Sequence, residues 1–456
     1  MLNCFALESA KTYPVITVLS IDEFPAWQAA QPVATQRWLT TTQFRAEQGA
    51  VRVIPDANGD IQSVVCCTMD KQILWSVGHL PFALPEGTYQ FDRNDPNYAA
   101  YACAWGLGAY QFTRYKSPTR APAKLYLPAA LTEEVTNTVE SIYHVRDLIN
   151  TPTDDMGPSQ LALSTEKLAQ EYGAVFKQIV GEALLEENYP CIYTVGRASD
   201  DAPRLLDLRW GNAKHPKVTL VGKGVCFDTG GLDLKGSAHM LLMKKDMGGA
   251  AHVLGLARMI MAAKLPVCLR VLIPAVENAV SGNAYRPGDI IKSRKGLTIE
   301  IGNTDAEGRV VLADALTEAV SEKPDVLIDI STLTGAARIA LGTELPAVFA
   351  NNDALVNDVI QHGDKCTDPM WRLPLFTLYR EYLNSPIADI NNNSAIGYGG
   401  AITAALFLKE FVPDDIPWLH FDIMAWNIGA RPGRPLGGEA MTLRALFNYL
   451  NTRFTK

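Results

Sequence analysis

The chain has 456 residues, of which 48% are hydrophobic and 20% are charged. This balance is typical of a globular protein and excludes a disordered chain, and the length predicts two domains. Lysine and arginine total 41 against 49 acidic residues, so the net charge is −8, and no basic run offsets it. A nucleic-acid partner is therefore not expected.

The first residues and the cysteines indicate a compartment. No apolar run is long enough to span a bilayer, and the first ten residues lack a basic region, so neither a membrane segment nor a secretory leader is expected. The eight cysteines include the neighbours Cys66 and Cys67 but no Cys-x-x-Cys pair. This argues against a disulfide framework and a thiolate zinc site, and it favours the reducing cytoplasm.

Up to about residue 130, short apolar segments alternate with turns. Strands are predicted at Val51–Ile54 and Ile61–Cys67, around the turn Asp56–Asp60. No cluster of catalytic residue types occurs here, so we interpret residues 1–130 as an assembly or regulatory domain.

Apolar residues then recur at helical spacing between Leu131 and Asn150, and Thr132 suits a helix start. The pattern stops at Asn150-Thr-Pro-Thr153. Residues 131–155 are therefore predicted to form a connecting helix, followed by a catalytic domain at 156–456.

Strands and helices alternate in that second part, which predicts a mainly parallel central sheet flanked by helices. The predicted fold class is α/β, with a smaller N-terminal α/β domain and a larger C-terminal catalytic domain. Ligand sites of such sheets lie at the carboxyl ends of the strands. The expected strands are Val218–Val221, Val267–Ile273, Leu297–Ile301 and Val326–Ile330, and the expected helices are Gly248–Lys264 and Val310–Ser321.

The segment Asn303–Arg309 places two acidic residues directly after a predicted strand. Asp305 and Glu307 are two apart, so in an extended segment their side chains point the same way. Two carboxylates at one point repel each other unless a cation or a proton lies between them. Taken alone, such a pair is more often a solvated acidic turn that caps the next helix.

Two further segments carry polar groups. Leu220–Gly231 places Lys223 and Asp228 in a predicted loop whose four glycines permit close backbone approach. It lacks the Gly-x-x-x-x-Gly-Lys-Ser/Thr order of a phosphate loop. Lys235 follows, and Asp246 stands just before a predicted helix, where a role as a cap alone is an alternative.

Together these segments offer four carboxylates, whose charge matches two divalent cations. His239 is the one histidine within them. Oxygen ligands suit Mn²⁺ or Mg²⁺, and Zn²⁺ also accepts carboxylates. In a paired site one cation activates water while the other holds the substrate.

These three segments resemble those of the leucyl aminopeptidase family, the cytosolic two-metal exopeptidases. The resemblance covers about residues 140–456, and the family's Asn-Thr-Asp-Ala-Glu-Gly-Arg signature is complete at Asn303–Arg309. Residues before that range resemble the family only in length and position.

The resemblance implies a ligand set for each of two metals. Asp228 and Glu307 would bridge both ions; Lys223 and Asp246 would complete one site, and Asp305 the other, with its carboxylate and its backbone carbonyl. Lys223 would bind as a neutral amine, because a divalent cation at bonding distance lowers the pKa of the ligand.

The resemblance also implies two catalytic residues. Lys235 would stay protonated and polarise the scissile carbonyl, and Arg309 would hold a bicarbonate ion as general base. Such an anion answers a question that the residues raise, since every carboxylate is used as a ligand and no catalytic histidine is evident. From the residues alone, Arg309 could instead pair with a ligand carboxylate, and Lys235 could be a surface lysine.

Substrate contacts are expected, by the same resemblance, in the loop Ser331–Gly335 and around it. Met243 would line the side-chain pocket and favour apolar first residues such as leucine, although a methionine can equally fill a core. The chain departs from the family at Trp426, where a small residue is usual, so the pocket is expected to be reshaped. The expected substrate-binding residues are Met243, Asn303, Thr332, Leu333 and Gly335.

The function predicted is a metal-dependent aminopeptidase, a hydrolase that removes the N-terminal residue of peptides with a water activated by two metals. Expected cofactors are two Mn²⁺ or Zn²⁺ ions per subunit, with Mg²⁺ a third candidate, and bicarbonate. A cytoplasmic homohexamer without membrane or nucleic-acid partners is expected. The alternative is a DNA-binding or assembly protein that keeps the fold; loss of a metal ligand or lysine would favour it, and none is lost.

Overall fold

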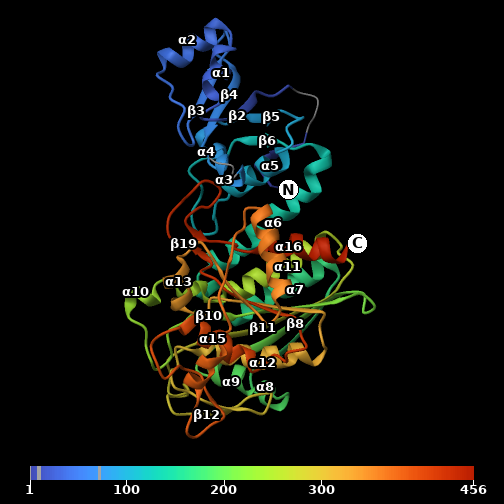
Figure 1. The fold of residues 1–456 in the computed structure, drawn as a ribbon, viewed down its shortest axis with the longest axis vertical. Coiled ribbons are helices and arrows are strands. Elements are labelled where there is room, and N and C mark those ends of the chain that lie inside the picture. The colour runs from blue at the N-terminus through green and yellow to red at the C-terminus, as the bar shows by residue number, and fades with distance from the viewer. Residues whose placement is uncertain (1, 8–11, 70–72, 456) are drawn as a thin grey trace. The chain divides into compact units, whose positions relative to one another are not determined.

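The computed structural model describes residues 2–7, 12–69 and 73–455. The chain forms two compact units, coloured in chain order in Figure 1. Unit 1 comprises Met1–Tyr143 and Gly429–Leu436, and unit 2 comprises His144–Ile428 and Gly437–Lys456. Among the described residues, no helix is both long enough and apolar enough to cross a membrane.

Unit 1 is built on a six-stranded sheet, in the order β1-β6-β5-β2-β4-β3. Its pairs are parallel except β3 with β4, and these two are the predicted hairpin strands, which confirms that prediction. The helix α5 (Tyr98–Gly108) packs on this sheet through Trp105, whose ring lies edge-on to Phe91. The strands are β1 (Phe5–Ala6), β2 (Val15–Ser20), β3 (Val51–Pro55), β4 (Ile61–Thr68), β5 (Thr88–Phe91) and β6 (Lys124–Tyr126).

The helix α6 (Ala129–Asn150) is the one predicted after residue 131, and it carries the chain from unit 1 into unit 2. Its apolar residues Val135, Val139 and Val145 are fully buried, which explains the helical spacing seen in the sequence. The division of the chain at residues 130 and 155 stays a prediction.

Unit 2 is built on a nine-stranded sheet, in the order β16-β15-β18-β14-β9-β11-β8-β7, with β10 also paired to β11. Its centre, β18-β14-β9-β11, is parallel, and β8, β7 and β15 pair antiparallel at the sides. The strands are β7 (Val175–Val180), β8 (Arg204–Gly211), β9 (Lys217–Gly222), β10 (Gly224–Asp228), β11 (Cys268–Asn278), β14 (Val326–Ser331), β15 (Ala347–Ala350), β16 (Trp371–Arg372) and β18 (Trp418–Asp422).

Helices cover both faces of this sheet, which confirms the α/β class predicted for the larger domain. Successive buried side chains of β14 enter different cores: Leu327 packs in one and Ile328 in the other. A strand buried on both faces explains the continuous apolar runs in the sequence. One face is covered by α7 (Pro158–Tyr172), α11 (Gly248–Ala262), α14 (Asp353–Lys365) and α16 (Leu443–Phe454), and the other by α9 (Pro190–Gly196), α12 (Glu307–Ser321) and α15 (Gly400–Lys409).

The prediction of a loop after Val221 is wrong, because Gly224–Asp228 forms the strand β10. The strand β11 is 11 residues long, and its first half pairs with β9 while its second half pairs with β10. The chain therefore bends at Lys223 and pairs again further along β11. Asp228 ends that second strand, opposite Asn278.

Two expectations about the acidic segment are also corrected. The strand before it, β13 (Thr298–Glu300), belongs to a separate three-stranded sheet with β12 (Ile290–Lys292) and β17 (Ile390–Asn391), and not to the central sheet. The helix α12 begins at Glu307, earlier than predicted, so Asp305 and Glu307 do not share an extended segment. A carboxylate in the first turn of a helix is stabilised by the backbone N–H groups there.

The contact between α11 and β14 predicts a stability effect at Gly249. A Cβ at Gly249 would lie 2.0 Å from the backbone oxygen of Ile330 and 2.8 Å from the backbone nitrogen of Lys223. Gly249→Ala should therefore lower the free energy of unfolding by about 3 kcal/mol, because neither backbone can move freely. Gly282→Ala, where no atom lies within 4 Å of a Cβ, is the control. Equal stability of both variants in urea unfolding would contradict this packing.

Candidate metal centre

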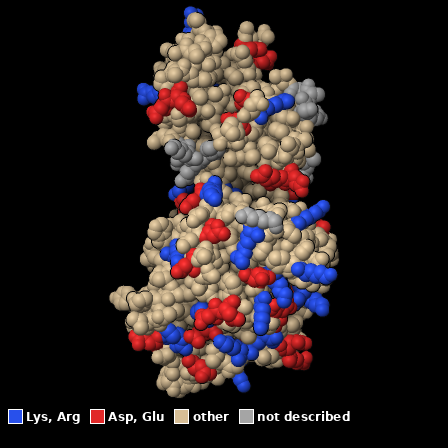
Figure 2. Space-filling model, turned by 45° about the vertical axis from the view of Figure 1, so that its right-hand side comes forward, with Lys and Arg blue, Asp and Glu red and all other residues tan. Residues whose placement is uncertain are grey.

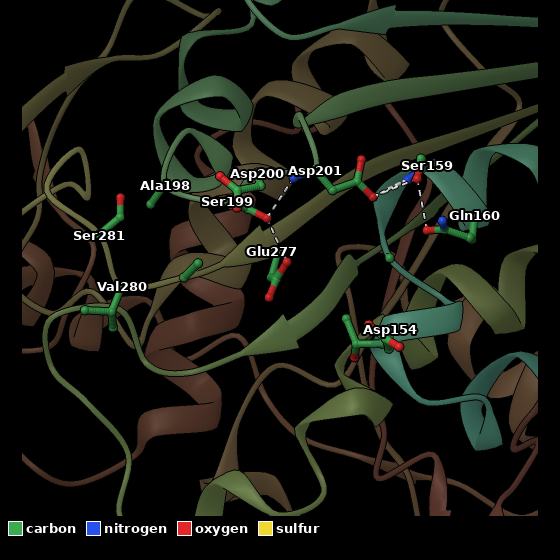
Figure 3. A pocket seen from close by; sticks show the side chains of 13 residues that line it. Asp154, Ser159, Gln160, Ala198, Ser199, Asp200, Asp201, Glu277, Val280 and Ser281 are labelled. Atoms are coloured by element: carbon green, nitrogen blue, oxygen red, sulfur yellow. Dashed lines mark hydrogen bonds between the residues drawn. The ribbon is translucent and has the colours of Figure 1, made fainter.

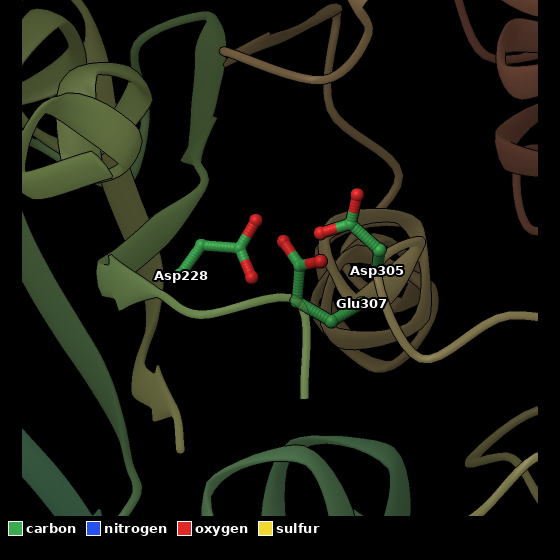
Figure 4. Close-up of side chains that lie close together, drawn as sticks. All are labelled: Asp228, Asp305 and Glu307. Carbon is green, nitrogen blue, oxygen red and sulfur yellow. The ribbon is translucent and has the colours of Figure 1, made fainter. Parts of the chain in front are cut away.

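Three carboxylates from different elements converge in unit 2. Asp228 at the end of β10, Asp305 in the turn before α12 and Glu307 at the start of α12 place oxygens within 4.8 Å of one another. Figure 4 shows the three side chains pointing towards one another. Asp228 and Glu307 are buried, and Asp305 is partly exposed. The two carboxylates of the segment Asn303–Arg309 are thus joined by Asp228, a third predicted ligand, from the strand β10.

A lysine lies on each side of this cluster. The Nζ atom of Lys223 is 2.6 Å from Asp246 and 2.9 Å from Glu307. The Nζ atom of Lys235 is 2.8 Å from Asp228 and also pairs with Asp305. The four carboxylates and two lysines of the sequence prediction therefore form one continuous charged cluster.

The bend between β9 and β10 directs Lys223 inwards. Its backbone N–H donates to the Ile330 carbonyl at 3.1 Å, and its carbonyl accepts from Ala250 at 2.8 Å. The side chain passes so close to α12 that a Cβ at Gly308 would lie 2.7 Å from the Lys223 ammonium. Glycine after Glu307 is thus required for this close approach.

Asp246 comes from the 3-10 helix η2 (Met243–Met247), which leads into α11. One of its carboxylate oxygens accepts a hydrogen bond from the Thr332 hydroxyl at 2.6 Å, and the other faces Lys223. The side chain is therefore aimed into the cluster and does not cap α11, which has no side-chain cap.

The cluster shifts the pKa values of its members. Burial, followed by the charge of Asp228, raises the pKa of Glu307 to about 8 and that of Asp305 to about 6. Burial lowers the pKa of Lys223, but the carboxylates of Asp246, Glu307 and Asp228 outweigh it and the net shift is upward. Burial likewise lowers the pKa of Lys235, and the carboxylate of Asp228 leads the interactions that raise it overall. The site thus holds a proton at neutral pH that a cation would displace.

Four buried oxygens of the cluster accept no hydrogen bond apart from the contacts with lysine. Oδ2 of Asp246, Oδ1 of Asp305 and Oε1 of Glu307 each face a lysine ammonium, and Oε2 of Glu307 faces no donor. Four carboxylates thus share two ammonium ions, and such an excess of buried negative charge is well matched by divalent cations, which bind carboxylate oxygens. The donor set, carboxylates with an amine and without thiolate or imidazole, fits Mn²⁺, Mg²⁺ or Zn²⁺.

Arg309 is buried and follows two residues after Glu307 on α12. Its Nη1 donates to the Asn392 carbonyl at 2.8 Å, while its Nε is buried without a partner. The Asn392 side chain accepts from Gly302 at 2.8 Å and donates to the Asn303 carbonyl at 2.8 Å. Arg309 is therefore held by a backbone carbonyl. The alternative considered from the sequence, an ion pair between Arg309 and a ligand carboxylate, is not formed. Burial lowers its pKa to about 10, so it stays charged.

The predicted substrate residues have different surroundings. Thr332 is buried beside Asp246, and its carbonyl is 3.5 Å from the Lys223 ammonium. The Leu333 N–H donates to Asp422 at 3.0 Å and is therefore already bonded within the protein. Gly335 is exposed at the start of α13 (Gly335–Leu341), and Met243 is half-buried at the start of η2.

The Asn303 side chain is bonded to the backbone of the turn in which it lies. Its side chain accepts the backbone N–H of Asp305 at 2.7 Å, which fixes the turn that presents the carboxylate. The geometry supports a role in shaping the turn.

Three polar residues of the site were missed by sequence reasoning. Asn278 donates to Asp228 at 2.8 Å and to the Thr304 carbonyl at 3.1 Å. The Thr304 hydroxyl donates to the Gly230 carbonyl at 2.6 Å, which ties the two acidic loops together. With Asn392 they hold the carboxylates in place. A buried polar residue near a predicted ligand is the only local signal that could have indicated them.

Apart from the carboxylate cluster, the structure has a cavity of about 820 Å³ that none of the predicted metal ligands lines. Figure 3 shows its carboxylates spread around the wall. Glu277 accepts from the Ser199 hydroxyl at 2.7 Å, and Asp201 accepts from the backbone and the hydroxyl of Ser159. Unlike Glu307, whose oxygens face no donor other than Lys223, these two acids accept hydrogen bonds from uncharged protein groups.

Comparison with known proteins identifies the family. Residues 143–447 match the family model described as "Cytosol aminopeptidase family, catalytic domain", and residues 14–128 match "M17 aminopeptidase, N-terminal domain". The chain belongs to the cytosol aminopeptidase family. This confirms the family, the two-domain α/β fold and the class of enzyme predicted from the sequence, a leucyl-type aminopeptidase hydrolase.

Individual relatives support the same family assignment. A probable cytosol aminopeptidase of Rhodopirellula baltica is 43% identical over 68% of this chain, and the match spans 62% of that protein, less than two thirds of its length. Peptidase B of Serratia proteamaculans is 42% identical over 71% of this chain and 78% of its own length.

Two solved structures share the fold. The crystal structure of a cytosol aminopeptidase from Coxiella burnetii has a TM-score of 0.97 and 53% identity, covering 99% of this chain and 100% of that one. The bottromycin maturation enzyme BotP, in complex with Mn, has a TM-score of 0.85 and 32% identity, covering 97% of this chain and 100% of BotP.

No comparison supports the DNA-binding alternative. On the face of the molecule shown in Figure 2, basic and acidic side chains are interspersed. Mixed charge of this kind does not form the basic surface that a phosphate backbone requires.

The proton held by Glu307 predicts a pH-dependent stability of the metal-free protein. A folded-state pKa of about 8, above its ordinary 4.5, stabilises the fold below pH 4.5, and that contribution is lost as pH rises through 8. The melting temperature in chelator should therefore fall from about pH 5 to about pH 8, and it should fall less in Glu307→Gln. Mn²⁺ should raise the parent's melting temperature at the higher pH but not that of the variant. Equal pH slopes would contradict this account.

Proposed function

We propose that the chain is a metal-dependent aminopeptidase that removes the N-terminal residue from peptides with a free amino terminus. The observation that carries this proposal is the convergence of the carboxylates of Asp228, Asp305 and Glu307, two of which are buried. Two divalent cations, Mn²⁺ or Zn²⁺ with Mg²⁺ as a third candidate, would supply an activated water and an anchor for the free amino group and the scissile carbonyl. A requirement for that amino group restricts cleavage to the first residue.

Five residues would hold the cations. The resemblance to the family implies that Asp228 and Glu307 would contact both cations. Lys223 and Asp246, whose Nζ and Oδ2 atoms lie 2.6 Å apart, would complete one site, and Asp305 the other. A cation at bonding distance would offset the carboxylate charges that raise the pKa of Lys223, so that Lys223 would bind as a neutral amine.

Lys235 would act on the substrate. Its ammonium faces Asp228 and Asp305, whose charges raise its pKa and keep it protonated. Lys235 therefore presents an N–H donor at the edge of the cluster. There it would orient the scissile carbonyl and stabilise the negative charge that develops on its oxygen.

Arg309 would bind bicarbonate. Its Nε has no partner and its charge is buried, whereas every carboxylate of the cluster is committed as a ligand. A bicarbonate ion held there would take the proton of the attacking water and pass it to the leaving amine.

The loop after β14 and the start of η2 would bind the peptide. The carbonyls of Thr332 and Leu333 and the backbone of Gly335 would contact its main chain, with Asn303 shaping the turn beneath. Met243 would line the side-chain pocket and favour apolar first residues such as leucine.

We further propose a cytoplasmic homohexamer. Apolar side chains of unit 2 that are largely exposed in the single chain support an assembly, among them Ile339 at 89% and Leu241 at 78%. Eight free cysteines support a reducing compartment.

Metal removal and blocked substrates test the function. Chelated protein should release no leucine from leucine amide, and Mn²⁺ should restore the release. N-acetyl-leucine amide should remain uncleaved, because its amino group cannot bind a cation. Asp305→Ala should be inactive with an unchanged melting temperature in chelator. Absence of Mn²⁺-restored activity on every unblocked substrate would refute the enzyme, and equal cleavage of acetylated substrates would refute the exopeptidase.

Bicarbonate tests the role of Arg309. Arg309→Met should lower kcat by about 10²–10⁴-fold, because the base is lost. Added bicarbonate should raise the activity of bicarbonate-depleted parent protein and leave that of the variant unchanged. A variant with the parent's bicarbonate response would show that the base is held elsewhere.

A further inference from the structure

Lys244 and Trp426 form a contact that the mechanism above does not use. The Lys244 ammonium donates to the Asn150 carbonyl at 2.6 Å, and the same nitrogen lies 5.5 Å from the centroid of the Trp426 ring. The first contact satisfies a carbonyl at the end of α6, and the second is within the range of a cation–π interaction. We call Lys244 with these two partners the Lys244 bridge.

Both partners of Lys244 are themselves fixed. The Asn150 side chain accepts the Gly438 N–H at 2.7 Å, and Gly438 pairs with Trp426 in the ribbon of β19 (Trp426–Asn427) and β20 (Gly437–Gly438). The four residues Asn150, Gly438, Trp426 and Lys244 therefore form a closed ring of contacts.

Glycine lets this ribbon approach α6. A Cβ at Gly437 would lie 2.5 Å from the Asn150 side-chain oxygen, and one at Gly438 would lie 3.0 Å from the Arg146 carbonyl. Next to the glycines, Glu439 accepts three hydrogen bonds from Arg146 and one from Asn427, and all three side chains are buried. A buried, bonded network of this kind holds the ring of contacts rigidly.

Lys244 connects this rigid ring to the metal centre through η2. The 3-10 helix is five residues long and has no side-chain cap at its start, so tertiary contacts must fix it. Asp246, two residues after Lys244, is the carboxylate of the cluster that comes from η2. The neighbouring Lys245 has no hydrogen-bond partner for its Nζ and cannot serve as the anchor.

We propose that Lys244 is a positioning residue: by binding the Asn150 carbonyl and the Trp426 ring, it fixes η2 so that Asp246 faces the cation site. Lys244 touches neither substrate nor cation. The inference rests on the proposed metal site.

Calorimetric titration of the full-length, metal-free protein with Mn²⁺ tests the proposal without any substrate. Lys244→Met should weaken the affinity for Mn²⁺ by about 10-fold or more, because outer contacts of a metal ligand have effects of that size. Lys244→Arg, which keeps both the donor and the charge over the ring, should restore most of the affinity.

Lys217→Met is the matched control. Lys217 also donates to a backbone carbonyl, that of Glu322 at 2.8 Å, but it stands at the opposite end of β9 from Lys223. Its removal should change the Mn²⁺ affinity by no more than about twofold.

Trp426 supplies a second pair of variants, in case Lys244→Met does not fold. Trp426→Phe keeps an aromatic face and should bind Mn²⁺ like the parent, whereas Trp426→Leu should bind it several-fold more weakly. If the parent binds no Mn²⁺, the proposed function fails. If the parent binds Mn²⁺ and Lys244→Met and Trp426→Leu bind it equally well, the Lys244 bridge has no positioning role and the proposed function stands.

Discussion

Mutual repulsion of buried carboxylates is the constraint on which this structure depends. Asp228, Asp305 and Glu307 place oxygens within 4.8 Å of one another, and two of the three are buried. Without a cation, protons and the two lysines offset the repulsion. Burial, followed by the charge of Asp228, raises the pKa of Glu307 to about 8. A site arranged in this way is unfavourable for stability when empty and favourable for a divalent cation, as expected where function outweighs stability.

The fold keeps these groups together by holding each on a different rigid element. A long strand, β11, pairs first with β9 and then with β10, so that Lys223 lies at the bend between them and Asp228 at the end of β10. The turn before α12 is tied to the neighbouring loop by the Thr304 hydroxyl. Because the supports are strands, a helix start and buried side-chain bonds, the carboxylates cannot move apart to relieve their repulsion.

The sequence predicted the chemistry of the site better than its geometry. Each charged residue expected in the cluster lies there, because residue types and spacing within a motif are local properties. The reason given for Asp305 and Glu307 was wrong, since a turn and a helix start bring them together and not an extended segment. Asp228 was expected in a loop, but pairing with β11, a distant segment, makes its segment a strand. Asn392, which holds Arg309, lies 83 residues further along the chain, and no local pattern indicates such a contact.

Diffraction from crystals grown with Mn²⁺, measured at the manganese absorption edge, tests the central claim most directly. Two anomalous peaks about 3.5–4 Å apart are predicted, one bounded by Lys223 and Asp246 and the other by Asp305, with Asp228 and Glu307 between them. Peaks elsewhere, or none among these side chains, would contradict the account of a two-metal centre.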